Sequence, residues 1–430
     1  MKFKTENTLY NQFKSSKFKK NSFWLILDQI IRTIISIIVS SLVARYFGVV
    51  TFGDLNFIII YVTFFQILAN FGSDTILAKE LIENEKHSLQ ILKSLLLFRL
   101  FFSVIILLFS FVIYYYFFNQ NSDLNLFLVI GSSIFFLSFN VFESFYISRN
   151  NFKITTLIKL LAFIIANLLK LIFLYFKLSV LAFGLLYTIE YILIASIYYL
   201  RLNQLLLIPF QFKRSFIFAR TIFKKSYKFG LSAILIMIYS RLDLLYMKAN
   251  LGGESVGLYI SVLNISNLLP AVALIFHNAA LPILSKLKIS DTNSYVNYSK
   301  IVVVTFGLIG FILSLIVYLS SDLIVTFIYG SSFFDSIEIL KLYVWSNVFI
   351  FVGVGCNLIL IIENLSHISL YRSVLGIIFA VLFNYIFIGK YMAIGAAFSF
   401  LFTQFIVTSY VLYRLKYILF SPNNVRFKSK

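Results

Sequence analysis

The chain has 430 residues, of which 60% are hydrophobic and only 13% are charged, and its mean hydropathy is +0.92. Soluble domains carry about 25% charged residues, so this composition excludes a soluble globular protein and indicates many membrane-spanning helices. The net charge of +20 does not indicate nucleic-acid binding, because the basic residues lie mainly in segments beside apolar runs. A single cysteine excludes an internal disulfide, and three scattered histidines lack the spacing of metal ligands.

The first apolar run, residues 22–44, is long enough to cross a bilayer as a helix. About 20 apolar residues, each rising ~1.5 Å, match the ~30 Å hydrocarbon core. No cleavable signal peptide is expected, because the basic segment before this run leads directly into a full-length span. Asp28 and Arg32 lie near the middle of the span, where each charge costs about 2.5–3.5 kcal/mol.

Two interpretations of Asp28 and Arg32 stay open. The residues are four positions apart, so they share one helix face and can neutralise each other as a buried pair. Alternatively, Arg32 faces a water-filled cavity and receives an anionic substrate, while Asp28 orients the guanidinium or titrates.

The apolar runs predict twelve spanning helices, and most Lys and Arg residues outside them fall on the side that holds both chain ends. The positive-inside rule therefore places both termini in the cytoplasm. The predicted helices, in chain order, are residues 22–44, 55–72, 94–118, 125–148, 154–176, 180–200, 229–248, 257–282, 299–320, 337–361, 366–388 and 391–413.

A long basic segment divides these helices into two groups of six. The expected organisation is a basic cytoplasmic tail (1–21), an N-terminal bundle (22–200), a basic cytoplasmic linker (201–228), a C-terminal bundle (229–413) and a second basic cytoplasmic tail (414–430). We expect the linker to tolerate insertions better than the turn at residues 48–53, because it joins bundles.

The two halves look like a duplication. Gly48 and Gly53 follow the first predicted helix, and Gly252 and Gly257 follow the seventh with the same spacing. Similarly, Lys159 in the fifth helix corresponds to Arg372 in the eleventh. Six helices is an even number, so the halves share one orientation, and their interface is where a transported substrate should bind.

Several ionisable residues fall within the predicted spans, where such residues usually mark a functional site. The candidates for binding an anionic substrate are Arg32, Lys159, Lys170, Arg241 and Arg372. The alternative for those near helix ends is that they extend to the headgroups, which is the role we expect for Arg99. The candidates for ion coupling or charge pairing are Asp28, Glu190 and Asp243. Asp243 lies two residues from Arg241 and hence on a different helix face.

Several segments resemble the bacterial O-antigen flippases (Wzx-type), whose superfamily includes the multidrug and toxin extrusion (MATE) transporters. The likeness covers nearly the whole chain. It rests on Trp24 and Gln29 with Arg32, on LVARYFG (42–48), FGDLNF (52–57), FGSDTILAKEL (71–81), FESFYISRNNFK (142–153), SRLDLLYMKANLGGESVGLY (240–259), YGSSF (329–333) and IGAAFS (394–399).

This resemblance implies an all-α polytopic membrane protein with about 12 helices in two six-helix bundles, MATE-like, around a central cavity. It implies no enzymatic activity and no cofactor. The expected activity is to flip an undecaprenyl diphosphate-linked oligosaccharide to the outer leaflet of the bacterial inner membrane, with proton or sodium coupling left open. Expected partners are this lipid-linked oligosaccharide, membrane lipids, a polysaccharide polymerase and a chain-length regulator, with no nucleic acid. The alternative is a MATE-type ion-coupled exporter of small organic cations, which would need more unpaired carboxylates at depth.

Overall fold

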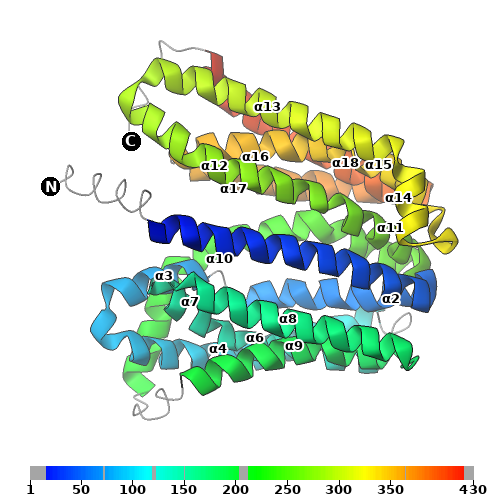
Figure 1. Cartoon of the computed structure of the whole chain (residues 1–430), viewed down its shortest axis with the longest axis horizontal. Coiled ribbons are helices and arrows are strands. Elements are labelled where there is room, and N and C mark those ends of the chain that lie inside the picture. The colour runs from blue at the N-terminus through cyan, green and yellow to red at the C-terminus, as the bar shows by residue number, and fades with distance from the viewer. Residues whose placement is uncertain are drawn as a thin grey trace. The chain divides into compact units, whose positions relative to one another are not determined.

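The computed structural model describes residues 16–70, 73–118, 123–149, 151–202, 212–363 and 365–420. These residues form helices joined by short turns, with no β-strand among them (Figure 1). The predicted basic tails lie outside this part of the chain up to residue 15 and from residue 421, as does the linker at 203–211.

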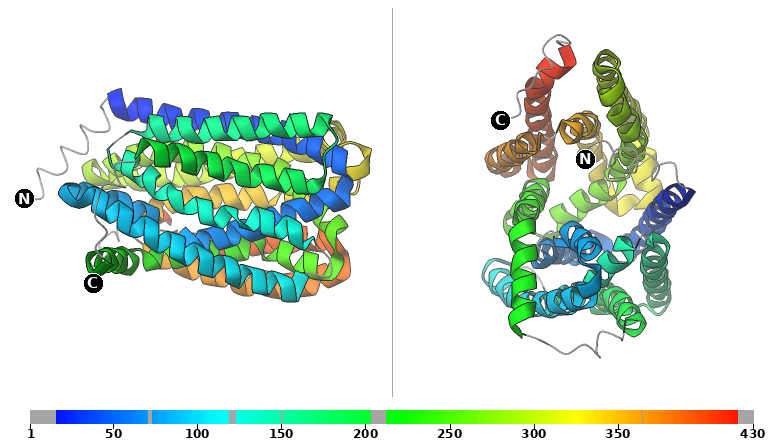
Figure 2. Two further views of the ribbon diagram at one scale, coloured as in Figure 1. Left: turned by 90° about the horizontal axis from the view of Figure 1, so that it is seen from below. Right: turned by 90° about the vertical axis from the view of Figure 1, so that its left-hand side faces the viewer.

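The chain divides into two compact units. Unit 1 comprises Met1–Val43 and Ile58–Ile234, and unit 2 comprises Ala44–Phe57 and Leu235–Lys430. Two long helices belong to both units, α2 (Ser16–Asn70) and α10 (Phe212–Leu251). Within each unit most of the helices run roughly parallel or antiparallel to one another, whereas the first part of α10 in unit 1 crosses its neighbours (Figure 2).

The remaining helices of unit 1 are α3 (Ser73–Glu83), η1 (Glu85–His87), α4 (Ser88–Phe118), α5 (Leu124–Gly131), α6 (Ser133–Leu137), η3 (Ser138–Asn140), α7 (Val141–Ser148), α8 (Phe152–Tyr175) and α9 (Val180–Arg201). Those of unit 2 are α11 (Gly253–Ser266), α12 (Leu268–Ser290), α13 (Thr292–Leu319), α14 (Ser321–Ile328), η5 (Ser331–Phe333), α15 (Ser336–Tyr343), α16 (Ser346–Ile362), α17 (Ser366–Phe383), η6 (Asn384–Ile388) and α18 (Gly389–Phe420).

All twelve predicted spans are helical. Within the described part of the chain, nine helical stretches are long and apolar enough to cross a membrane. Two of them, Ile31–Asn70 and His367–Leu419, each cover most of two predicted spans. The backbone leaves helical geometry inside them at Gly48 and Met392. The remaining predicted span, 229–248, lies within α10. The prediction of a polytopic, all-helical membrane protein is therefore confirmed.

Two short helices were not predicted. The 11-residue helix α3 packs on α7 in unit 1, and the eight-residue helix α14 follows α13 in unit 2. At ~1.5 Å per residue both are too short to cross the hydrocarbon core, so a search for spanning runs passes over them. In addition, the second part of the predicted linker is helical, because α10 begins at Phe212.

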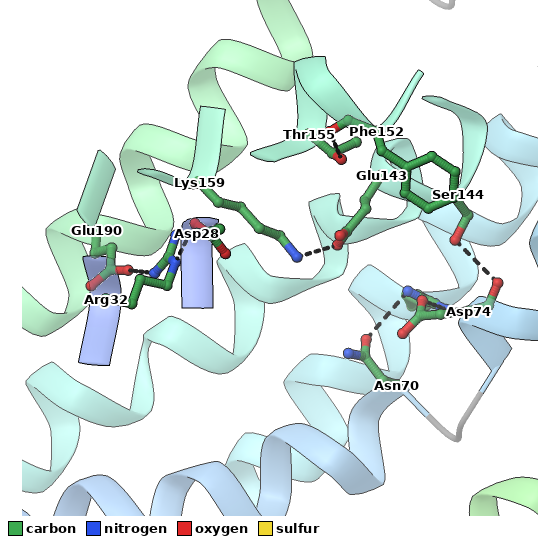
Figure 3. A network of polar contacts seen from close by, with 11 residues as sticks. Asp28, Arg32, Asn70, Asp74, Glu143, Ser144, Phe152, Thr155, Lys159 and Glu190 are labelled. Carbon is green, nitrogen blue, oxygen red and sulfur yellow. Dashed lines mark hydrogen bonds and ion pairs between the residues drawn. The ribbon is translucent and has the colours of Figure 1, made fainter. Parts of the chain in front are cut away.

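Arg99 of α4 contradicts our expectation that it extends to the headgroups. Its side chain is only 3% exposed and donates to Asp74 Oδ1 at 2.7 Å and to Asn70 Oδ1 at 3.3 Å. The Ser144 hydroxyl donates to the Asp74 backbone carbonyl at 3.3 Å, which adds α7 to the same contact (Figure 3). Arg99 thus joins the end of α2 to the start of α3, and its charge is paired inside the protein.

The repeated glycines have the same local conformation in both halves. Gly48 has φ 72° and ψ 177°, and Gly252 has φ 84° and ψ −170°, a region that favours glycine. Within unit 2, a Cβ on Gly53 would overlap the Gly253 carbonyl and lie 2.7 Å from the Gly257 nitrogen. The two repeated turns therefore pack backbone against backbone, which requires glycine at the contact.

Candidate functional site

Three of the predicted residues gather within unit 1, and a fourth, Lys170, lies on a helix beside them. Arg32 and Asp28 lie on the first part of α2, Glu190 lies on α9, and Lys170 lies on α8. Arg32 Nε donates to Asp28 Oδ1 at 2.9 Å, and Arg32 Nη1 is 3.5 Å from Glu190 Oε1 (Figure 3). Helix α8 packs against α9, but Lys170 forms no ion pair with a described residue. We call Asp28, Arg32 and Glu190 the Arg32 cluster.

The Arg32 guanidinium is held on several sides but is not saturated. Its carbon lies 4.7 Å from the centre of the Phe163 ring of α8, a cation–π contact that fixes the guanidinium plane. Arg32 Nη2 is buried and has no hydrogen-bond partner among the described residues. The Arg32 side chain is 23% exposed and that of Glu190 is 18% exposed. The cluster therefore retains an unused donor and partial access.

Lys159 of α8 forms a separate ion pair. Its ammonium lies 2.5 Å from Glu143 Oε2 of α7, and Figure 3 shows the lysine side chain pointing toward that carboxylate. Glu143 is visible in the sequence as a carboxylate within a span, but nothing in the spacing of the two residues identifies it as the partner of Lys159. Among the described residues of unit 1, Lys159 and Arg32 thus both contact carboxylates.

The two predicted cations of unit 2 differ from Arg32 and Lys159 of unit 1. Arg241 of α10 and Arg372 of α17 form no ion pair with any described residue. Arg372 Nε is buried without a hydrogen-bond partner in that same part of the chain. A Cβ on Gly353 of α16 would lie 3.3 Å from Arg372 Nη2, so the glycine leaves room for the guanidinium.

Asp243 is the most enclosed of the predicted carboxylates. It is 4% exposed, accepts a hydrogen bond from the Tyr259 hydroxyl at 2.5 Å, and accepts another from the Leu244 backbone N–H at 2.8 Å. Arg241 acts on it only as a nearby charge, as expected for residues two positions apart on a helix. Tyr259 was not predicted, because a hydroxyl on another helix has no sequence signal that connects it to Asp243.

The described residues contain no cluster of three or more His, Cys, Asp or Glu side chains that would hold a metal ion. The site chemistry present is that of guanidinium and ammonium groups opposed by carboxylates. Such groups can bind anions and exchange protons.

The chain resembles known proteins in sequence and in fold. A family model described as "Polysaccharide biosynthesis protein" matches residues 18–288. A search of curated proteins finds no match in sequence. Among solved structures, the chain is similar to the lipid II flippase MurJ in an inward closed conformation, with 15% identity and a TM-score of 0.75 over 91% of this chain and 87% of that one.

Two further structures have the same fold. An inward-facing multidrug resistance MATE family transporter of the MOP superfamily is 13% identical, with a TM-score of 0.70 over 90% of this chain and 94% of that one. A MOP superfamily transporter from Pyrococcus furiosus, described as having a binding pocket of reverse polarity, is 14% identical, with a TM-score of 0.65 over 94% and 96%. At such low identity, the structural similarity shows the fold alone, and it confirms the predicted MATE-like fold.

Proposed function

The chain belongs to the polysaccharide biosynthesis protein family, and from this premise we propose that it is a flippase for undecaprenyl diphosphate-linked oligosaccharides. It would carry the repeat unit from the cytoplasmic to the outer leaflet of the inner membrane, for synthesis of an O-antigen or capsule-type polysaccharide. The similarity of fold to a lipid II flippase supports this proposal. No bond is made or broken in such a reaction.

The observation that carries the proposal is the unused donor of Arg32. A diphosphate that crosses the membrane loses its hydration, and a guanidinium compensates by bidentate, charge-assisted hydrogen bonds. Arg32 Nη2 offers such a donor and is partnered by no described residue. Lys170 of α8, the helix that packs against α9, is a further basic candidate in unit 1. In unit 2, Arg241 and Arg372 are the corresponding candidates.

The carboxylates of the Arg32 cluster have a role in this proposal. Without substrate, Asp28 and Glu190 compensate the Arg32 charge, whose burial alone would be costly. An arriving diphosphate competes with them for the guanidinium. Protonation of Glu190 would weaken its hold on Arg32, so this residue is our candidate for coupling to protons.

One observation favours the second candidate, an ion-coupled exporter of organic cations. In the described part of unit 1, Asp28, Glu143 and Glu190 match the cations Arg32, Lys159 and Lys170 in number. A cluster with balanced charge binds an anion less strongly than the basic residues alone suggest. The fold similarity to a multidrug resistance transporter fits this alternative equally well.

The proposed topology follows from the basic segments. Both termini and the linker at 201–228 would face the cytoplasm, with bundles at 22–200 and 229–413. A polysaccharide polymerase and a chain-length regulator would act on the product at the outer surface. A reporter fused at residue 425 that proves to lie outside the cytoplasm would overturn this topology.

The test is to delete the gene and analyse both surface polysaccharide and lipid-linked intermediates. A flippase predicts accumulation of the undecaprenyl diphosphate-linked repeat unit and loss of the surface polymer, restored by the wild-type gene. Normal polysaccharide together with increased sensitivity to cationic drugs would instead support the exporter and contradict the flippase.

A further inference from the structure

A group of uncharged polar side chains continues from Glu190 through unit 1. It comprises Tyr187 and Tyr191 of α9, Thr63 and Gln66 of α2, and Ser133 of α6. The Tyr187 hydroxyl is 3.4 Å from Thr63 Oγ1 and 3.3 Å from the Tyr191 hydroxyl. The Tyr191 hydroxyl is 3.3 Å from Gln66 Oε1, and Gln66 Nε2 is 2.9 Å from Ser133 Oγ. We call these five residues the tyrosine cluster.

The hydrogen bonds that Ser133 and Thr63 donate to backbone carbonyls determine which group donates in most of the other hydrogen bonds of the cluster. Ser133 donates its proton to the Ile130 carbonyl at 2.6 Å, so its oxygen accepts from the Gln66 amide nitrogen. The amide is thereby oriented with its oxygen toward Tyr191, which must donate to it. At the other end, Thr63 donates to the Ile59 carbonyl at 2.8 Å, so its oxygen is left as an acceptor toward Tyr187.

Tyr187 consequently has one proton for two acceptors. Either the Tyr191 oxygen or the Thr63 oxygen receives it, and the other lacks a donor within the cluster. Both contacts are also long compared with the usual 2.7–2.8 Å between hydroxyl oxygens, so each is weak. A ligand hydroxyl group could donate the missing hydrogen bond, and only weak contacts within the cluster would be lost.

The two tyrosines also offer ring surface. Both side chains are partly exposed, and their ring centres are 5.3 Å apart with the planes inclined at 57°. Aromatic rings that combine an apolar face with a polar hydroxyl suit a ligand that presents both C–H faces and hydroxyl groups. A sugar ring has this character, whereas an isoprenoid chain or an inorganic ion does not.

The tyrosine cluster adjoins the Arg32 cluster, where we propose that the diphosphate binds. Glu190, which contacts Arg32, is three residues from Tyr187 on α9, so the two lie on one helix face. We infer that the tyrosine cluster is a subsite for the sugar ring bonded directly to the diphosphate, and that it sets selectivity for that sugar. This inference rests on the flippase proposal and adds to it which part of the substrate the protein recognises.

The test measures binding of two kinds of probe to the full-length, purified protein. One probe is a short isoprenyl diphosphate, and the others are the same lipid carrying a hexose, an N-acetylhexosamine or a 6-deoxyhexose. Tyr187→Phe and Tyr191→Phe remove hydroxyls but keep the rings. Tyr199→Phe, at an exposed position (43%) on the same helix, is the control.

We expect the wild-type protein to bind at least one glycosylated probe more tightly than the bare diphosphate. Each cluster variant should lose about three- to tenfold in affinity for that probe, as expected for one or two neutral hydrogen bonds, with less than a twofold change for the bare diphosphate. Retained binding of the bare diphosphate also shows that the variant is folded. Arg32→Lys should instead weaken both kinds of probe by a similar factor.

Three outcomes would overturn the inference. If no sugar improves binding to the wild-type protein, or if the tyrosine variants weaken all probes equally, the tyrosine cluster is not a sugar subsite, although the diphosphate site stands. If the wild-type protein binds none of the probes, the flippase proposal fails and the subsite fails with it.

Discussion

Two of the three predicted intramembrane cations of unit 1 form ion pairs with described residues, whereas neither of the two in unit 2 does. In unit 1, Arg32 contacts Asp28 and Glu190, and Lys159 contacts Glu143. In unit 2, neither Arg241 nor Arg372 forms an ion pair with a described residue. In the proposed function, Arg32 would therefore compensate carboxylates as well as offer a charge to the substrate, whereas Arg372 would offer only the charge. Loss of function on substitution has a different meaning in each unit.

The largest effect is expected at Arg32, where charge pairing and substrate binding lead to the most different expected results. Arg32→Ala should abolish transport, because charge-assisted hydrogen bonds worth about 1.5–3 kcal/mol each are lost at the diphosphate. Arg32→Lys should restore only part of the activity, since an ammonium lacks the planar fork. Transport of the lipid-linked repeat unit would be measured at matched amounts of membrane protein.

The control for Arg32→Ala must remove both carboxylate partners. The change leaves Asp28 and Glu190 without their cationic partner. A double variant that replaces only Asp28 and Arg32 would therefore still contain one unpaired carboxylate, Glu190. The informative comparison is the triple variant Asp28→Asn, Arg32→Ala, Glu190→Gln. If transport returns in the triple variant, Arg32 serves only to neutralise the carboxylates, and the substrate-binding role is wrong.

The next effect concerns unit 2, where the two repeated turns depend on close backbone packing. Gly53→Ala should destabilise the protein by about 1–3 kcal/mol, the usual cost of overpacking, because the added carbon overlaps the backbone of Gly253 and Gly257. Gly389→Ala is the matched control, since a Cβ there meets no atom within 4 Å and its φ is −61°. Thermal unfolding in detergent would measure both. Equal unfolding temperatures for the two variants would contradict the packing argument.

Hydropathy predicted the spans because each run of about 20 apolar residues has one stable arrangement in a bilayer. The same principle could not reveal α3 or α14, whose stability comes from tertiary contacts. Nor could it predict that the segment Ala44–Phe57 of α2 belongs to unit 2, although the segments on either side of it belong to unit 1. Within unit 2 this segment makes the close contact at Gly53 and the 2.5 Å ion pair between Asp54 and Lys248, neither of which has a local sequence signal.

The candidate site was predictable to the extent that its geometry is local. Asp28 and Arg32 pair as their spacing of four residues predicted, because i and i+4 side chains lie on one helix face. Glu190 was recognised as a carboxylate within a span, but its contact with Arg32 joins α9 to α2 and has no local signal. The tyrosine cluster was missed for the same reason, since tyrosine is abundant in the chain and only the fold selects Tyr187 and Tyr191.

A smaller effect is expected at Arg372, which tests the other side of the comparison. Arg372→Gln should weaken diphosphate binding about three- to tenfold, because one charge is lost among several that act on the ligand. It should leave the unfolding temperature unchanged, since no described carboxylate loses a partner. Arg414→Gln, at an exposed position on α18, is the control. A clear loss of stability without loss of affinity would show that Arg372 is structural.

The smallest effect is expected at a helix end outside the spans, where charge acts on stability alone. Asp291 caps α13: its Oδ1 accepts from the Asn293 and Ser294 backbone N–H groups, and its Oδ2 accepts from the Ser294 hydroxyl at 2.5 Å. The hydrogen bonds from Ser294, aided by that from Asn293, lower the pKa of Asp291 in the folded protein. The stabilisation is therefore fully present above the ordinary aspartate pKa of the unfolded chain and is lost as the pH falls through the lowered folded value. Asp291→Asn keeps a capping oxygen without a titrating group, so its unfolding temperature should decrease slightly less than that of the wild-type protein as the solution is acidified across this range. If the two proteins respond identically to acid, the cap of α13 does not depend on the Asp291 charge.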